Sequence, residues 1–210
     1  MEKEKKYLLL NWILLTGYGC INLFATYSSI YSWPTQGSNI WFLLIIFCPP
    51  FLYHLVFIAY VSVLKKRPHW KKIYRLLTMI CGVLLAGGLL QLTQKISLTR
   101  FKSAYSPMIA QVQQRMPSPC AADYFETPEV NRYNHSVTQK LLKQGKPMGG
   151  LLYNAQRFVL HFRAGSVDMD NSTIFYDSEM KNWRFFHNDD VAEAENFAAR
   201  SKGLTPCNLF

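Results

Sequence analysis

Three histidines in the C-terminal half of the chain, His135, His161 and His187, have side chains suited to catalysis or metal binding. Their spacing forms no HExxH or HxH pattern and no cluster with cysteines, which are the arrangements typical of metal centres. His161 and His187 lie in runs with strand character, where a half-exposed histidine is ordinary. The histidines therefore predict neither a metal nor a cofactor.

Acidic and hydroxyl residues offer the next candidates for catalytic chemistry. The segment 168–171 (DMDN) resembles the start of a calcium-binding loop, but it lacks the glycine and the distant glutamate that such a loop requires. We interpret it as a solvated turn. The serines of this half lie outside any nucleophile elbow. The sequence therefore predicts a protein that is not an enzyme.

Two cysteines, Cys120 and Cys207, lie near the two ends of the C-terminal half. The other three, Cys20, Cys48 and Cys81, fall one in each long apolar segment, where a thiol serves as a small apolar residue. The chain contains no CxxC motif. A pair of cysteines in a domain on the oxidising side of a membrane predicts a disulfide between Cys120 and Cys207.

Aromatic residues are crowded into a short stretch with hairpin character. Five of them exceed what one face of a small sheet can bury: Phe175, Tyr176, Trp183, Phe185 and Phe186. Exposed aromatic surface is typical of a binding site, so we interpret these residues as a candidate surface for a partner protein. A sheet that is covered on both faces explains the same surplus equally well.

One apolar segment contains two prolines and a histidine, Pro49, Pro50 and His54. Adjacent prolines predict a kink because they remove two backbone donors. An ionisable side chain inside a membrane span is a candidate functional residue, so we consider such a role for His54. The alternative is that His54 only packs between the helices. Asn11 and Asn22 lie on one face of the preceding segment, where we expect them to form hydrogen bonds between helices.

Long uncharged runs set the architecture that positions these residues. Residues 7–64 contain no Lys, Arg, Asp or Glu, and a second uncharged run follows from 76 to 94. Runs of this length predict membrane-spanning helices. We expect three of them, at 7–31, 40–64 and 73–93, with Gly82 and Ala86 at the spacing that allows close helix contact.

The basic residues between the second and third runs fix the orientation. Residues 65–75 carry six positive charges and no acid, so the positive-inside rule places the loop 65–72 and the N-terminal residues 1–6 in the cytoplasm. Residues 95–210 then form an extracytoplasmic domain, periplasmic in a bacterium and lumenal in a eukaryotic endomembrane. The net charge of this part is only +3, from 14 basic and 11 acidic residues, which argues against nucleic-acid binding.

Apolar periodicity predicts a small α+β domain with an antiparallel sheet in residues 95–210. The expected elements are helices starting at Ser106 and at Pro128, strands at 151–163, 173–177 and 183–187, and a closing helix capped by Asn188 or Asp189. We expect Val191, Ala194, Phe197 and Ala198 to form the buried side of that last helix, and Gly203 to end it.

Together these features predict a bacterial inner-membrane protein without enzymatic activity. Its periplasmic domain is expected to bind another membrane or periplasmic protein, as accessory and immunity or exclusion proteins do. A small transporter or channel subunit, with a path near the kinked second span, is the alternative. The lipid bilayer is the other expected partner, and self-association into an oligomer stays open.

Overall fold

A computed structural model gives the fold of the chain. The residues that it describes are 2–31, 38–64, 72–120, 124, 127–134, 148–164, 172–187 and 190–208. The chain divides into two compact units, Met1–Ile30 with Gly37–Ser97, and Tyr31–Gln36 with Leu98–Phe210.

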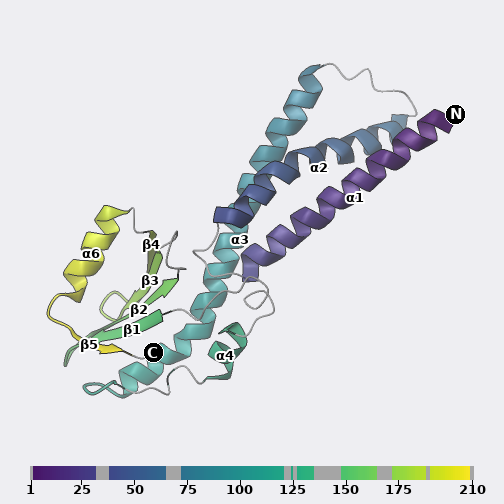
Figure 1. The fold of residues 1–210 in the computed structure, drawn as a ribbon. Coiled ribbons are helices and arrows are strands. Elements are labelled where there is room, and N and C mark those ends of the chain that lie inside the picture. Colours follow the sequence, from purple (N-terminus) through teal and green to yellow (C-terminus); the bar gives the residue numbers. More distant parts are fainter. Residues whose placement is uncertain are drawn as a thin grey trace. The chain divides into compact units, whose positions relative to one another are not determined.

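The first unit consists of three long helices. Helix α1 spans Glu2–Tyr31, α2 spans Ser38–Leu64, and α3 begins at Lys72 and continues to Gln114 in the second unit (Figure 1). Each helix contains a stretch that is long and apolar enough to cross a bilayer. The prediction of three apolar helices followed by a small antiparallel sheet is confirmed.

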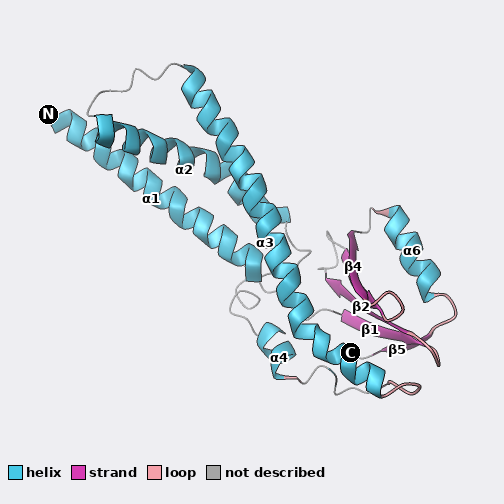
Figure 2. Cartoon of the chain, turned by 180° about the vertical axis from the view of Figure 1, so that it is seen from behind, coloured by secondary structure: helices cyan, strands magenta, loops and turns pink. Residues whose placement is uncertain are grey.

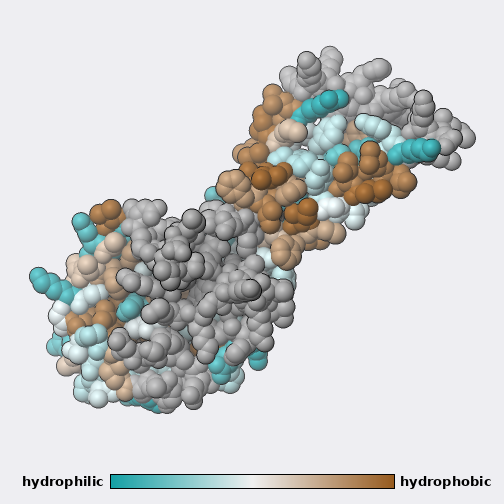
Figure 3. Space-filling view, in the orientation of Figure 1, coloured by the Kyte–Doolittle hydropathy of each residue, from teal (hydrophilic) through white to brown (hydrophobic). Residues whose placement is uncertain are grey.

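Apolar side chains cover the outside of this first unit. Leu23 of α1 and Leu84 of α3 are about 70% exposed, and Phe42 of α2 is 67% exposed. Brown, hydrophobic atoms gather over this unit in the space-filling view (Figure 3). Such surfaces are unfavourable in water and are ordinary where a helix faces lipid.

The three helices pack together around a cluster of small residues and leucines. Ala25, Leu44, Cys48, Ala86 and Leu90 form a buried cluster that takes members from all three helices. A Cβ atom on Gly82 would lie 2.4 Å from the Cα atom of Pro49. The backbones of α2 and α3 therefore approach closely at the proline pair, as small residues at helix contacts allow.

The second unit is built on a five-stranded antiparallel sheet of order β4-β3-β2-β1-β5 (Figure 2). The strands are β1 Met148–Tyr153, β2 Phe158–Ala164, β3 Ser172–Asp177, β4 Asn182–His187 and β5 Thr205–Asn208. The described residues of this unit also form the helices α4 at Pro128–Asn134 and α6 at Val191–Ser201.

The sheet has more strands than the sequence predicts. The expected single strand 151–163 is wrong, because a turn divides it into β1 and β2. Asn154 makes that turn, since its side-chain oxygen accepts hydrogen bonds from the backbone N–H groups of Gln156 and Arg157. Strand β5 follows the closing helix and was not expected. The hairpin of β3 and β4 forms as predicted.

Helix α3 does not end before Ser106, so the expectation of a new helix there is wrong. The helix continues through Pro107 to Gln114. Proline removes one backbone hydrogen bond from a helix, but Phe101, Tyr105, Met108 and Val112 are all fully buried. Their spacing places them on one stripe of the helix. Burial of this stripe outweighs the lost hydrogen bond.

The last helix differs from its prediction in two respects. Its N-cap is Asp190, whose side chain accepts a hydrogen bond from the backbone N–H of Glu193. Its packed side holds Ala194 and Phe197, whereas Val191 and Ala198 are exposed. Gly203 follows the helix with a φ of 77°, a conformation that glycine adopts without strain. The expected helix from Pro128 is described only to Asn134.

The contact between Gly82 and Pro49 can be tested by adding one methyl group. We expect Gly82→Ala to lower the thermal unfolding midpoint of the detergent-solubilised chain, because overpacking costs about 1–3 kcal/mol. Gly87→Ala is the matched control, since no atom lies within 4 Å of its added Cβ. Equal midpoints for the two variants would contradict the close approach of α2 and α3.

Candidate functional site

The five aromatic residues expected at a partner surface lie on both faces of the sheet. Strand alternation and the observed register place Phe175 and Phe186 on one face, and Tyr176, Trp183 and Phe185 on the other. Phe175 is fully buried and Phe186 is 5% exposed, whereas Phe185 is 36% exposed. The five residues therefore do not form one exposed surface.

Helix α6 covers the face that carries Phe175 and Phe186. The two rings form a buried cluster with Val159, and Phe197 of α6 lies 5.1 Å from Phe175 and 5.9 Å from Phe186 between ring centroids. Phe175 and Phe186 are thus core residues in the folded domain.

The opposite face packs on the second half of α3. The shared cluster includes Phe101 and Tyr105 of α3 together with Leu160 and Phe162 of β2. Trp183 is partly buried against this cluster, with its ring 5.4 Å from that of Phe101. Tyr176 also packs there. Burial, and then the adjacent Asp177 charge, raise the pKa of Tyr176 above its ordinary value.

A small set of large apolar side chains in the second unit remains exposed. Among the residues that the structure describes there, these are Met180, Phe185 and Val191. Phe185 lies on β4, Met180 lies in the turn before it, and Val191 is the first residue of α6. Two of the three exposed apolar side chains therefore belong to the β3–β4 hairpin, at one edge of the sheet.

The two edges of the sheet differ in the protection of their backbones. Strand β5 is short and contains Pro206, which lacks a backbone donor, and Cys207, which is held by a disulfide. Its short length and its proline both make this edge a poor template for another strand. Strand β4 contains no proline, and within the described part of the chain it pairs only with β3. Strand β4 is the edge better suited to accept another strand.

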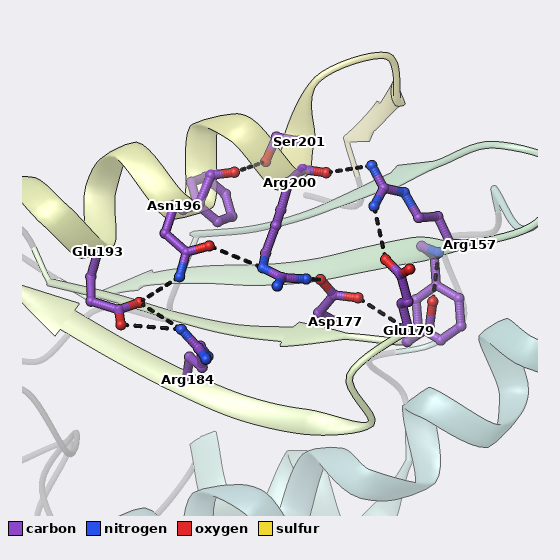
Figure 4. A network of polar contacts seen from close by, with 11 residues as sticks. Arg157, Asp177, Glu179, Arg184, Glu193, Asn196, Arg200 and Ser201 are labelled. Carbon is purple, nitrogen blue, oxygen red and sulfur yellow. Dashed lines mark hydrogen bonds and ion pairs between the residues drawn. The ribbon is translucent and has the colours of Figure 1, made fainter.

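An ion pair at the centre of Figure 4 attaches α6 to the sheet. Asp177 of β3 is 1% exposed, and its Oδ2 atom accepts a hydrogen bond of 2.7 Å from Nη1 of Arg200. The Nε atom of Arg200 donates to Oδ1 of Asn196, one turn earlier in the helix. The other carboxylate oxygen of Asp177 accepts from the backbone N–H of Glu179. The buried charge is thus both paired and hydrogen-bonded.

Two further ion pairs extend this contact. Nη1 of Arg184 on β4 lies 3.1 Å from a carboxylate oxygen of Glu193 on α6. Arg157 bonds to the carboxylate of Glu179 and to the backbone carbonyl of Arg200. We call the three ion pairs, Asp177–Arg200, Arg184–Glu193 and Arg157–Glu179, the α6 clasp. Its charges serve to hold the helix, because each carboxylate already has an arginine partner.

Sequence reasoning did not identify the α6 clasp. A signal was present, because Glu193, Asn196 and Arg200 are spaced by three and four residues and so share one helix face. Their partners on the sheet could not be found in the same way, since strand register depends on contacts distant in the sequence.

A polar contact joins α1 and α2 in the first unit. Nδ1 of His54 lies 2.8 Å from Oδ1 of Asn11, and Nδ2 of Asn11 donates to the backbone carbonyl of Tyr7. That second bond fixes the amide orientation, so the histidine nitrogen is the donor to Asn11. The ring of Tyr18 stacks on His54 with centroids 5.7 Å apart.

Asn22 makes a second contact between the same helices. Its Nδ2 atom donates to the backbone carbonyl of Phe47, at 3.2 Å, in the turn before the proline pair. The expectation that Asn11 and Asn22 form hydrogen bonds between helices is confirmed. The sequence analysis did not identify His54 as the partner of Asn11. A signal was present, because the two residues lie at similar numbers of residues from the α1–α2 connection. Asn11 lies 20 residues before Tyr31, and His54 lies 16 residues after Ser38.

Cys120 and Cys207 form a disulfide, as predicted. Cys120 lies shortly after the end of α3, and Cys207 lies in β5 opposite Leu151 of β1. Their Cα atoms are 5.9 Å apart across a sequence separation of 87 residues. The bond therefore links the end of α3 to the last strand of the sheet.

Most of the other candidate residues for chemistry lie apart or outside the described part of the chain. His135, Asp168 and Asp170 are outside it, as is the side chain of His187. His161 lies beside Gly150, with its ring 5.7 Å from Phe197. Among the described residues, no group of three His, Cys, Asp or Glu side chains could hold a metal ion.

Comparisons of the chain with protein-family models, with curated proteins and with solved structures find no match.

The α6 clasp predicts unequal costs for removing its ion pairs. Arg200→Met leaves the buried Asp177 carboxylate without a cation. Because the Arg200 side chain is 26% exposed, we expect a loss at the low end for a buried pair, about 3 kcal/mol in the free energy of unfolding. Glu179 is 64% exposed on its side chain, so Glu179→Gln should cost about 0–1 kcal/mol. Urea unfolding of the solubilised chain measures both. A loss for Glu179→Gln as large as that for Arg200→Met would contradict this ranking.

Proposed function

We propose that the chain is a membrane-anchored binding protein. Its three apolar helices span a bilayer, and its sheet domain binds another protein on the extracytoplasmic side through the β4 edge. The observation that carries this proposal is the position of Met180, Phe185 and Val191, the large apolar residues left exposed in the described part of the second unit.

Two features support the extracytoplasmic placement of the sheet domain. Six positive charges in residues 65–75 favour a cytoplasmic loop between the second and third helices. Three crossings then put the first and last parts of the chain on opposite sides. The disulfide between Cys120 and Cys207 fits the same side, because disulfides persist in oxidising compartments.

Backbone chemistry supports strand pairing as the mode of binding. An edge strand presents N–H and C=O groups that an extended peptide can use, and side-chain contacts then provide specificity. Phe185 and Met180 would supply apolar contact beside such a strand. Lys181 is exposed in the turn that precedes β4, so an extended segment with an acidic side chain near this turn fits the edge best.

Site-specific photo-crosslinking tests the binding surface. A photoreactive phenylalanine analogue at Phe185 should crosslink to one protein species in intact cells, and Phe185→Asp should lower co-purification of that species at least about tenfold, or 1.4 kcal/mol. The matched control position is Ala155, which is exposed in the β1–β2 turn at a distance in the chain from β4. Crosslinks from position 155 but none from 185 would contradict the proposal.

The polar contact within the first unit supports a second candidate, a small transporter or channel subunit. Asn11 and His54 place hydrogen-bonding groups inside otherwise apolar helices, where polar residues often mark a pathway. For this function we expect His54→Leu to abolish flux in vesicles while Phe185→Asp leaves flux unchanged. Flux that His54→Leu leaves unchanged would show that the pair serves packing alone, and no flux above that of protein-free vesicles would contradict this second function.

A further inference from the structure

The two sulfur atoms of the disulfide lie in different surroundings. Cys120 is exposed, in the irregular segment that follows α3. Cys207 is 8% exposed and belongs to the cluster between the sheet and α3. Its strand is paired with β1, where Leu151 opposite Cys207 is fully buried. One cysteine of the pair is therefore an exposed residue, and the other belongs to the buried core.

The segment that carries Cys120 has its own attachment to the domain. The hydroxyl of Tyr124 donates a hydrogen bond to the backbone carbonyl of Pro119, and the Tyr124 ring is fully buried. The guanidinium of Arg115 lies 5.0 Å from the centroid of that ring. These contacts do not involve the disulfide. They would therefore keep Cys120 near Cys207 when both are thiols.

We propose that Cys120 is the exchange site of this domain, the sulfur at which an external disulfide or thiol reacts, and that Cys207 is the resolving sulfur. Thiol–disulfide exchange requires a thiolate to reach a sulfur atom, so its site is decided by access as well as by thiolate character. Cys120 is the exposed residue of the pair and Cys207 is the buried one, so we assign the accessible sulfur to Cys120. This inference does not depend on the proposed binding partner.

The reaction has two balanced steps. The Cys120 thiolate attacks one sulfur of a donor disulfide, such as oxidised glutathione or the disulfide of a dithiol oxidase, and the other donor sulfur leaves as a thiol. The Cys207 thiolate then attacks the Sγ atom of Cys120 and releases the second donor sulfur. The donor gains two electrons and two protons, and the domain loses them as Cys120 and Cys207 join. Reduction by an external dithiol follows the reverse path, also through Cys120.

The test uses the full chain in detergent, with Cys20, Cys48 and Cys81 changed to Ala. In this background Cys207→Ser leaves the thiol of Cys120, and Cys120→Ser leaves the thiol of Cys207. Each variant is incubated with oxidised glutathione, and adduct formation is followed by intact mass. We expect the Cys120 thiol to react at least about tenfold faster in the folded protein, and the two rates to agree within about twofold in denaturant.

A second measurement covers variants that fail to fold. The protein with both cysteines is reduced without denaturant and treated with less than one equivalent of iodoacetamide, and the alkylated site is mapped. Alkylation at Cys120 supports the assignment. Equal alkylation of both sulfurs, faster reaction at Cys207, or unfolding of the reduced domain would overturn it, because the proposal requires a folded reduced state that shields Cys207.

Discussion

The packing of the second half of α3 against one face of the sheet is the contact on which the second unit depends. Phe101, Tyr105, Met108 and Val112 are fully buried in it. Burial of a large apolar side chain contributes about 1.5–3 kcal/mol before the entropy cost of ordering the chain is subtracted. Loss of any one of the four is therefore a large change for a domain whose net stability is typically about 5–15 kcal/mol. One helix thus supplies both an apolar span and the core of the sheet domain.

The remaining face of the sheet and its last strand need attachments of other kinds. Helix α6 has partly buried residues but none that is fully buried, and the ion pair of its Arg200 with the buried Asp177 adds a specific contact between that helix and β3. The disulfide fixes β5 to the end of α3. With one edge blunted and both faces covered, two of the three exposed apolar side chains, Met180 and Phe185, remain on the β3–β4 hairpin, and this is why the proposed binding surface lies there.

Local patterns predicted the features that depend on composition. Uncharged runs gave the three helices, the hairpin signal around residues 178–182 gave β3 and β4, and cysteine placement gave the disulfide. The crowding of aromatic residues in the β3–β4 hairpin had two interpretations. The alternation of side chains along a strand shows which residues share a face of the sheet, but not whether another element covers that face. Phe186 and Phe185 are neighbours in sequence, yet only Phe186 is buried beneath α6. The helix beyond Pro107 was missed because tertiary packing overrides a local stop signal.

The location of the sheet domain is the central claim, and cysteine accessibility measures it most directly. Ala155→Cys introduces a thiol into the exposed β1–β2 turn, and Lys66→Cys introduces one into the basic loop. Intact spheroplasts are treated with a membrane-impermeant maleimide before and after lysis. The account predicts labelling of Cys at position 155 before lysis and at position 66 only after it. The reverse order would contradict the account.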